Sequence, residues 1–265
     1  MKPDQFIPLS PAEFLKSKDI ISDDLDRNAL PAEKTGKNLE LDALEEGIRL
    51  YHAKDWENAL QAFLEVDKTG FSSDQRVEIA YYLGLCYAKT RQYEEAVLYL
   101  EQVIISGGDV MRTYQCRMTL AYIYVTTGRG KMAEYELRRL LKTGFESAQL
   151  YNTLAYVAYT QKRYRNAVEL YEKALDLDKD NATALNSMGY ILADTGIDRV
   201  KGLRLCRKAV DQKPQSPVYL DSLGWAYYKC GETVEARSLL KRAMELAPNE
   251  QEIKKHLMTV SGEAV

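Results

Sequence analysis

Side chains able to carry catalysis or hold a metal ion are few in this sequence. Only two histidines are present, His52 and His256, and they lie near opposite ends of the chain. A metal centre or a nucleophilic triad needs several such groups to converge on one point. Acidic residues are plentiful, but no two of them stand out as a matched acid and base. We therefore predict no catalytic residues, no metal site, no cofactor and no enzymatic activity.

Two short motifs resemble ligand-binding loops but depart from them at the residues that matter. The run Asp176–Asn181 spaces its acids like a calcium loop, yet Asn181 stands where that loop needs Gly, and Ser187 stands where it needs Glu. Residues 128–131 (Gly-Arg-Gly-Lys) lack the spacing of a phosphate-binding loop. Both motifs are better interpreted as turns.

Composition and charge narrow the classes of partner. The formal net charge of −3 gives no electrostatic reason to expect nucleic acid or an anionic membrane. No apolar run approaches the roughly 20 residues of a membrane-spanning helix, and residues 1–8 lack an apolar export segment. We expect a cytoplasmic protein without membrane insertion. Tyrosine is unusually frequent, with 19 Tyr against 5 Phe and 2 Trp, and its apolar ring with a polar tip suits half-wet binding surfaces.

Four cysteines lie far apart and form no CxxC pair: Cys86, Cys116, Cys206 and Cys230. This spacing predicts reduced thiols, buried or half-buried, rather than a disulfide framework.

An internal repeat dominates the chain. Small residues recur in pairs separated by 12 positions: Gly47 and Ala59, Gly84 and Ala96, Ala121 and Ala133, Ala155 and Ala167, and Gly224 and Ala236; in a sixth pair, Gly189 and Gly202, the separation is 13. Four positions after each second member comes Phe63, Leu100, Leu137, Tyr171, Cys206 or Leu240. Small residues allow two helices to approach closely while the bulky ones fill the neighbouring grooves. The pattern predicts stacked helix–turn–helix units of about 34 residues.

Two features of the repeats are notable. In the third unit, Arg117 stands where a large apolar residue is expected, which leaves its packing open. The runs 68–71 and 142–145 are near-copies (Lys-Thr-Gly-Phe) at the ends of the first and third units. Gly directly after a helix, followed by an apolar residue, is typical of a helix C-terminus.

The last unit carries the motif Leu220-x-x-Leu223-Gly224-x-x-Tyr227, followed by Ala236-x-x-x-Leu240 and Pro248, and the second unit is close to it. This pattern resembles the tetratricopeptide-repeat family, and the C-terminal repeats look most like those of bacterial members. The resemblance implies an all-α, right-handed α-α superhelical solenoid of about six units plus a C-terminal capping helix. The units are expected near 40–73, 77–110, 114–147, 148–181, 182–216 and 217–249, with the cap at 250–260. The solenoid as a whole would cover 39–260, preceded by a mostly irregular tail, 1–38, with a possible short helix near 11–19.

In that family, the first helix of each unit lines a concave groove, which implies a set of partner-binding residues here. The implied residues are Leu44, Ile48, Tyr81, Met118, Tyr122, Asn152, Tyr156, Tyr159, Asn186, Tyr190, Asp221, Trp225 and Tyr228. Amide side chains can pair with the backbone of an extended peptide while aromatic rings cover its apolar side chains. Separate core positions are already filled by Leu83, Leu120, Leu154, Met188 and Leu223, which favours a binding role for the row.

The predicted function is that of an adaptor or scaffold that binds a peptide or helix of another protein in this groove. The alternative is self-assembly, in which the apolar first repeat (Leu41, Leu44, Ile48, Tyr51) and the N-terminal tail mediate homo-oligomerisation. An enzyme is the third hypothesis, and nothing in the sequence favours it.

Overall fold

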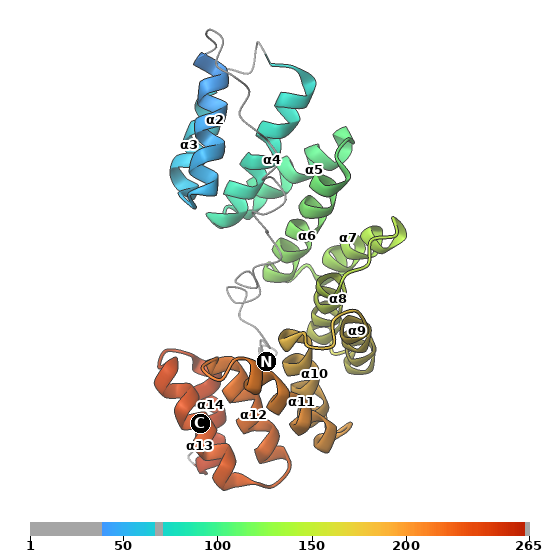
Figure 1. Ribbon diagram of the computed structural model, residues 1–265, viewed down its shortest axis with the longest axis vertical. Coiled ribbons are helices and arrows are strands. Elements are labelled where there is room, and N and C mark those ends of the chain that lie inside the picture. The colour runs from blue at the N-terminus through green and yellow to red at the C-terminus, as the bar shows by residue number, and fades with distance from the viewer. Residues whose placement is uncertain (1–38, 67–70, 263–265) are drawn as a thin grey trace. The chain divides into compact units, whose positions relative to one another are not determined.

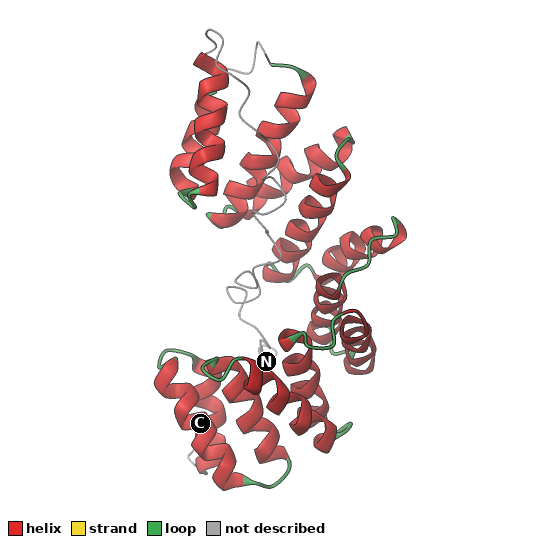
Figure 2. Cartoon of the chain, viewed as in Figure 1, coloured by secondary structure: helices red, strands yellow, loops and turns green. Residues whose placement is uncertain are grey.

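The computed structural model describes residues 39–66 and 71–262, with side chains from residue 43 onward. The predicted tail, with its short helix near 11–19, lies outside these residues. Within them the chain is all-helical, as predicted (Figure 2). The helices, labelled in Figure 1, are α2 (Leu39–His52), α3 (Trp56–Glu65), α4 (Ser73–Lys89), α5 (Tyr93–Ser106), α6 (Val110–Thr126), α7 (Gly130–Lys142), α8 (Ala148–Thr160), α9 (Tyr164–Leu177), α10 (Ala182–Thr195), α11 (Arg199–Gln212), α12 (Pro217–Lys229), α13 (Thr233–Leu246) and α14 (Gln251–Ser261). None of them is long and apolar enough to cross a membrane.

Consecutive helices pair into six antiparallel hairpins, from α2 with α3 to α12 with α13, and α14 follows as a single C-terminal helix. The described residues form two compact units, one holding α2–α7 and the other α8–α14. The predicted bounds of the six repeats and of the tail stay predictions.

Polar side chains cap the N-termini of several helices. Ser72 caps α4 in a capping box with Gln75, and the carboxylate of Asp109 accepts a hydrogen bond from the Arg112 N–H at the start of α6. Ser216 caps α12, whose first turn contains Pro217. These caps satisfy backbone donors that would otherwise lack partners at helix N-termini.

The paired small residues do bring the helices of each hairpin together. A Cβ atom added at Gly84 would lie 2.8 Å from Leu100 Cδ2, and one at Gly224 would lie 2.9 Å from Leu240 Cγ. Between α10 and α11 the contact is with backbone, since a Cβ at Gly202 would lie 2.6 Å from the carbonyl oxygen of Gly189. The predicted bulky residues and core positions are buried around these contacts.

Arg117, the residue that breaks the apolar pattern, is buried in a polar contact. Its guanidinium Nη1 donates to the Glu136 carboxylate of α7, and the two side chains are only 11% and 10% exposed. A buried ion pair therefore fills the place that an apolar side chain takes in the other repeats. The signal that could have predicted it is the pairing of two charged residues at mutually facing core positions of one hairpin.

Both loop-like motifs lie at the junctions between two helices, with a turn flanked by the end of one helix or the start of the next. Residues 127–129 connect α6 to α7, and Asn181 is the N-cap of α10, where its side chain accepts a hydrogen bond from the Ala184 N–H. At the end of α7, Gly144 has a φ of +85°, which is the left-handed conformation that favours Gly after a helix.

Candidate partner-binding surface

The predicted partner-binding residues lie on the first helices of the hairpins, and burial divides them into two sets. The buried set is Leu44, Tyr81, Met118, Tyr122, Asn152, Asn186, Tyr190 and Asp221. The half-buried set is Ile48, Tyr156, Tyr159, Trp225 and Tyr228. Only the half-buried set can touch a partner without displacement of other side chains, so the binding role of the whole row stays a prediction.

The buried set is covered because first helices of successive hairpins pack against one another. Tyr81 on α4 donates its hydroxyl hydrogen to Gln115 Oε1 on α6 over 2.5 Å. Asn152 on α8 donates to Oδ1 of Asn181, the residue that caps α10, over 2.9 Å. Side chains that were expected to meet a peptide backbone thus connect one repeat to the next. Sequence spacing identified the correct helices but could not distinguish these two roles.

Asp221, another predicted binding residue, is buried against the C-terminal helix. Nδ1 of His256 on α14 lies 2.9 and 3.0 Å from the two carboxylate oxygens of Asp221 on α12. Both side chains are at most 5% exposed, and Nε2 of His256 lies 3.6 Å from a carboxylate oxygen of Glu252. Sequence reasoning gave His256 no role. The available signal was its distance of 35 residues from Asp221, which is one repeat period.

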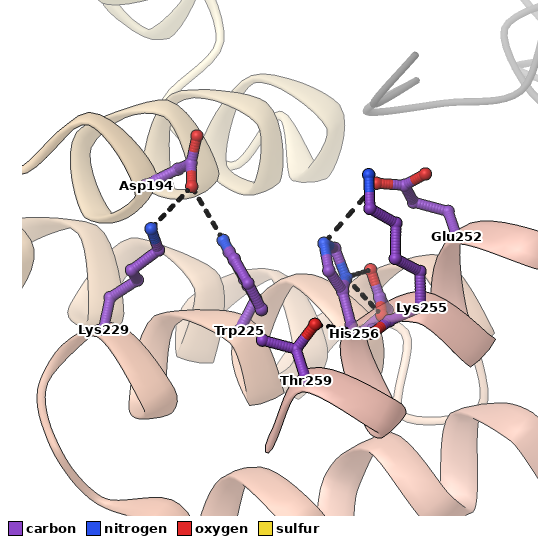
Figure 3. Close-up of polar contacts among 8 residues, drawn as sticks. Asp194, Trp225, Lys229, Glu252, Lys255, His256 and Thr259 are labelled. Atoms are coloured by element: carbon purple, nitrogen blue, oxygen red, sulfur yellow. Dashed lines mark hydrogen bonds and ion pairs between the residues drawn. The ribbon is translucent and has the colours of Figure 1, made fainter. Parts of the chain in front are cut away.

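Trp225 stands at the centre of a group of charged and aromatic side chains (Figure 3). Its indole N–H donates to Asp194 Oδ1 over 2.9 Å. The His256 ring stacks on the indole with centroids 4.1 Å apart, and Lys229 Nζ lies 4.9 Å from the indole centroid. Lys229 also pairs with Asp194 Oδ1 over 3.1 Å. Figure 3 shows Trp225 between Lys229 and His256, so both side chains contact one indole ring.

Two tyrosines on α8 extend this group toward the preceding hairpin. Burial raises the pKa of Tyr156 to about 12. Burial, and after it the negative charge of Asp194, raise the pKa of Tyr159 well above its usual value. Both phenols therefore stay neutral near pH 7, where they can donate or accept hydrogen bonds. Tyr156, Tyr159, Asp194, Trp225 and Tyr228, on helices α8, α10 and α12, are hereafter called the aromatic row.

The unit that holds α2–α7 offers less of the predicted surface. Of the predicted residues there, only Ile48 is half-buried. The apolar first repeat, proposed above for self-assembly, has Leu44 and Tyr51 each only 3% exposed. The Tyr51 ring packs edge-on against Trp56 and Tyr82. This part of the first repeat therefore has little apolar surface to give to a second copy.

Groups suited to metal binding or nucleophilic chemistry do not gather among the described residues. No three His, Cys, Asp or Glu side chains there lie close enough to share a metal ion. All four cysteines are free thiols, three buried and Cys230 half-buried, as predicted. Burial raises the pKa of Cys86 and of Cys116 to about 12. Thiols with such pKa values are protonated at neutral pH and are poor nucleophiles.

Comparison with known sequences agrees with the repeats. The family model for the tetratricopeptide repeat protein 21 C-terminal ARM domain matches residues 27–223, and a tetratricopeptide-repeat model matches 220–254. The chain is 34% identical over 108 residues to TPR repeat-containing protein PA4667 of Pseudomonas aeruginosa, which covers 39% of this chain and 18% of that protein. It is 31% identical over 186 residues to human protein O-mannosyl-transferase TMTC1, which covers 69% of this chain and 21% of that one. The chain thus spans about a fifth of the length of these curated relatives.

Comparison with solved structures gives the same fold. YrrB, described as a TPR protein with an unusual peptide-binding site, superposes with a TM-score of 0.52 at 16% identity, over 69% of this chain and 92% of YrrB. Such a low identity supports the architecture alone. Together with the family model that covers most of the chain, the helical hairpins and their small-residue pairs show that this chain belongs to the tetratricopeptide-repeat family.

Proposed function

We propose that this chain is an adaptor or scaffold that binds a segment of another protein along the aromatic row. Tetratricopeptide-repeat proteins generally mediate protein–protein interactions and generally act as non-catalytic scaffolds. We propose that this chain likewise has no enzymatic activity of its own. The partner is a protein or peptide rather than nucleic acid, and the site of action is the cytoplasm.

The observation that carries the proposal is the row of half-buried aromatic side chains on first helices. Tyr156 and Tyr159 lie on α8, and Trp225 and Tyr228 lie on α12, while Asp194 on α10 contacts Trp225 and influences Tyr159. Tyr and Trp are the residues most often found as anchors of protein interfaces, since they give large contact areas with few rotatable bonds. The half-buried carboxylate of Asp194 among them adds a polar group that can orient a partner.

The experiment is capture of partners from a native lysate, followed by titration calorimetry with the purified partner. The double variant Tyr156→Ala, Trp225→Ala should weaken binding by more than about tenfold, because two anchors are lost. A matched control replaces two exposed apolar residues on second helices, Leu177→Ala and Val234→Ala. Equal affinities for the wild type and the double variant would refute the proposal.

The stability of the double variant must be checked, because Trp225 also packs on His256. Thermal unfolding monitored by circular dichroism serves this purpose. If the double variant is less stable, Tyr228→Ala combined with Tyr156→Ala replaces it, since both side chains are half-buried. Affinity is expected to be micromolar, about −8 kcal/mol.

Self-association is a second candidate function, and one observation favours it. On α5, Leu98 and Ile105 are 69% and 84% exposed and lie seven residues apart, on one side of the helix. Such an apolar stripe can pair with a second copy. Light scattering coupled to gel filtration tests this candidate. A dimer that becomes monomeric on the change Leu98→Lys, Ile105→Lys supports it, and a wild-type monomer excludes it.

A further inference from the structure

We propose that the aromatic row recognises an arginine side chain of the partner, which replaces Lys229 at the Trp225 indole and the Asp194 carboxylate. This inference rests on the proposed function and names the chemistry of the partner. Its basis is a cation that the chain itself places at this position.

The position of Lys229 indicates that this surface attracts a cation. Its ammonium group lies over the indole ring and beside the carboxylate at the same time, at 4.9 Å and 3.1 Å. The negative face of an indole ring and a carboxylate both attract a cation. The side chains of Lys229 and Asp194 are 27% and 33% exposed. An ion pair with this much exposure is weak, so another cation can displace Lys229.

Asp194 has capacity left for an incoming donor. Its two contacts with described residues, from Trp225 Nε1 and from Lys229 Nζ, both end on Oδ1. A lysine ammonium acts as a compact point charge, whereas a guanidinium presents parallel N–H groups that can pair with both carboxylate oxygens. The same planar group also stacks on an indole ring. Arginine therefore fits this position better than the resident lysine does.

Asp194 is the carboxylate that favours a cation at this position, since it contacts both Trp225 and Lys229. Asp221 and Glu252 contact His256 instead, and Lys255 lies beside Glu252 (Figure 3). The negative charge of Asp194 also contributes, after burial, to the raised pKa of Tyr190 on the same helix, α10. When Lys229 moves away, the carboxylate of Asp194 loses its only counter-ion among the described residues.

The chain offers an internal control for stacking without a carboxylate. Its other tryptophan, Trp56, has Lys89 Nζ 5.0 Å from its ring centroid, and its ring packs on Tyr51. Among the residues that the structure describes, no carboxylate hydrogen-bonds to the Trp56 indole. A probe that merely stacks on tryptophan should affect both indoles, and a probe that needs Asp194 should affect only Trp225.

The test uses the full-length protein with 15N-labelled tryptophan. Because the chain has two tryptophans, two indole N–H signals are expected, and a Trp56→Phe variant assigns them. The probe is N-acetyl-arginine amide, and the neutral isostere N-acetyl-citrulline amide is the control. The arginine probe should shift the Trp225 signal in a saturable way, while the citrulline probe leaves it in place and neither moves the Trp56 signal.

Variants decide whether Lys229 and Asp194 have the proposed roles. Lys229→Met removes the resident competitor and should tighten binding of the arginine probe by about fivefold. Asp194→Asn should abolish the saturable shift, and Lys89→Met should have no effect on it. Circular dichroism confirms that each variant is folded. Equal shifts with citrulline, no shift even in Lys229→Met, or no gain in affinity in that variant would each overturn the inference.

A further arm separates this inference from the proposed function. A peptide selected by display on the full-length protein is synthesised with each arginine replaced in turn by citrulline. If binding needs Tyr156 and Trp225 but no arginine, the arginine assignment fails and the proposed function stands. If no selected peptide depends on the aromatic row, the proposed function itself fails.

Discussion

Glu136→Ala should destabilise the unit that holds α2–α7 more than any surface change there. The carboxylate of Glu136 pairs with Arg117, and the two side chains are 10% and 11% exposed. Removal of one partner leaves the guanidinium of Arg117 buried without its counter-ion, a change that costs about 3–5 kcal/mol. Replacement of both partners by apolar residues, Arg117→Met with Glu136→Leu, should be neutral within about 1 kcal/mol or stabilising, because no buried charge remains.

The assay is urea unfolding monitored by circular dichroism, with hydrogen exchange of the α6 and α7 amides as a local measure. Hydrogen exchange is needed because repeat proteins can unfold in steps, so one transition need not report on this hairpin. The matched control is Arg138→Ala, which removes an exposed partner of Glu134 on the same helix α7 and should cost less than about 1 kcal/mol. If Glu136→Ala costs no more than the control, the pair is not buried as described and the packing of this hairpin is different.

Two further predictions concern the unit that holds α8–α14, and a third concerns the cysteines of both units. Gly202→Ala should gain about 1 kcal/mol of helix propensity but lose more than that, since its Cβ would lie 2.6 Å from the Gly189 carbonyl oxygen; urea unfolding should show a net loss of about 1–3 kcal/mol. His256→Ala leaves Asp221 buried without its partner. The change should cost about 3 kcal/mol of unfolding free energy and speed hydrogen exchange in α14. The control His52→Ala, at an exposed histidine, should alter neither quantity. A thiol reagent at pH 8 should modify Cys230 quickly in the native protein and all four cysteines only after unfolding, because burial raises the pKa of the other three thiols further.

The architecture could be predicted because it depends on residue size at a fixed period. A small residue at Gly84 or Gly224 and a bulky one at Leu100 or Leu240 are required wherever two helices approach this closely. Such a requirement recurs in every repeat, so that a single sequence displays it several times over. A departure from the pattern at one position, such as Arg117, does not hide the repeat.

The surface could be predicted only in part, because exposure depends on what lies opposite each side chain. Asn152 and Tyr159 lie on the same helix, α8, yet Asn152 bonds to the N-cap residue of α10 while Tyr159 is half-buried. Asp194 was not predicted as a binding residue because it lies one position beyond those that the family motif assigns to the groove. Its role follows from a partner 31 residues away, Trp225, which the pattern of one helix cannot reveal.

Photo-crosslinking from single positions tests the central claim most directly. A benzophenone amino acid replaces Tyr159 in the aromatic row or, as the control, the exposed Leu177 at the end of α9. The protein is irradiated with the captured partner, and the covalent product is identified by mass spectrometry. Our account predicts a crosslink to the partner from position 159 and none from position 177. A crosslink from 177 with none from 159 would show that the partner binds elsewhere.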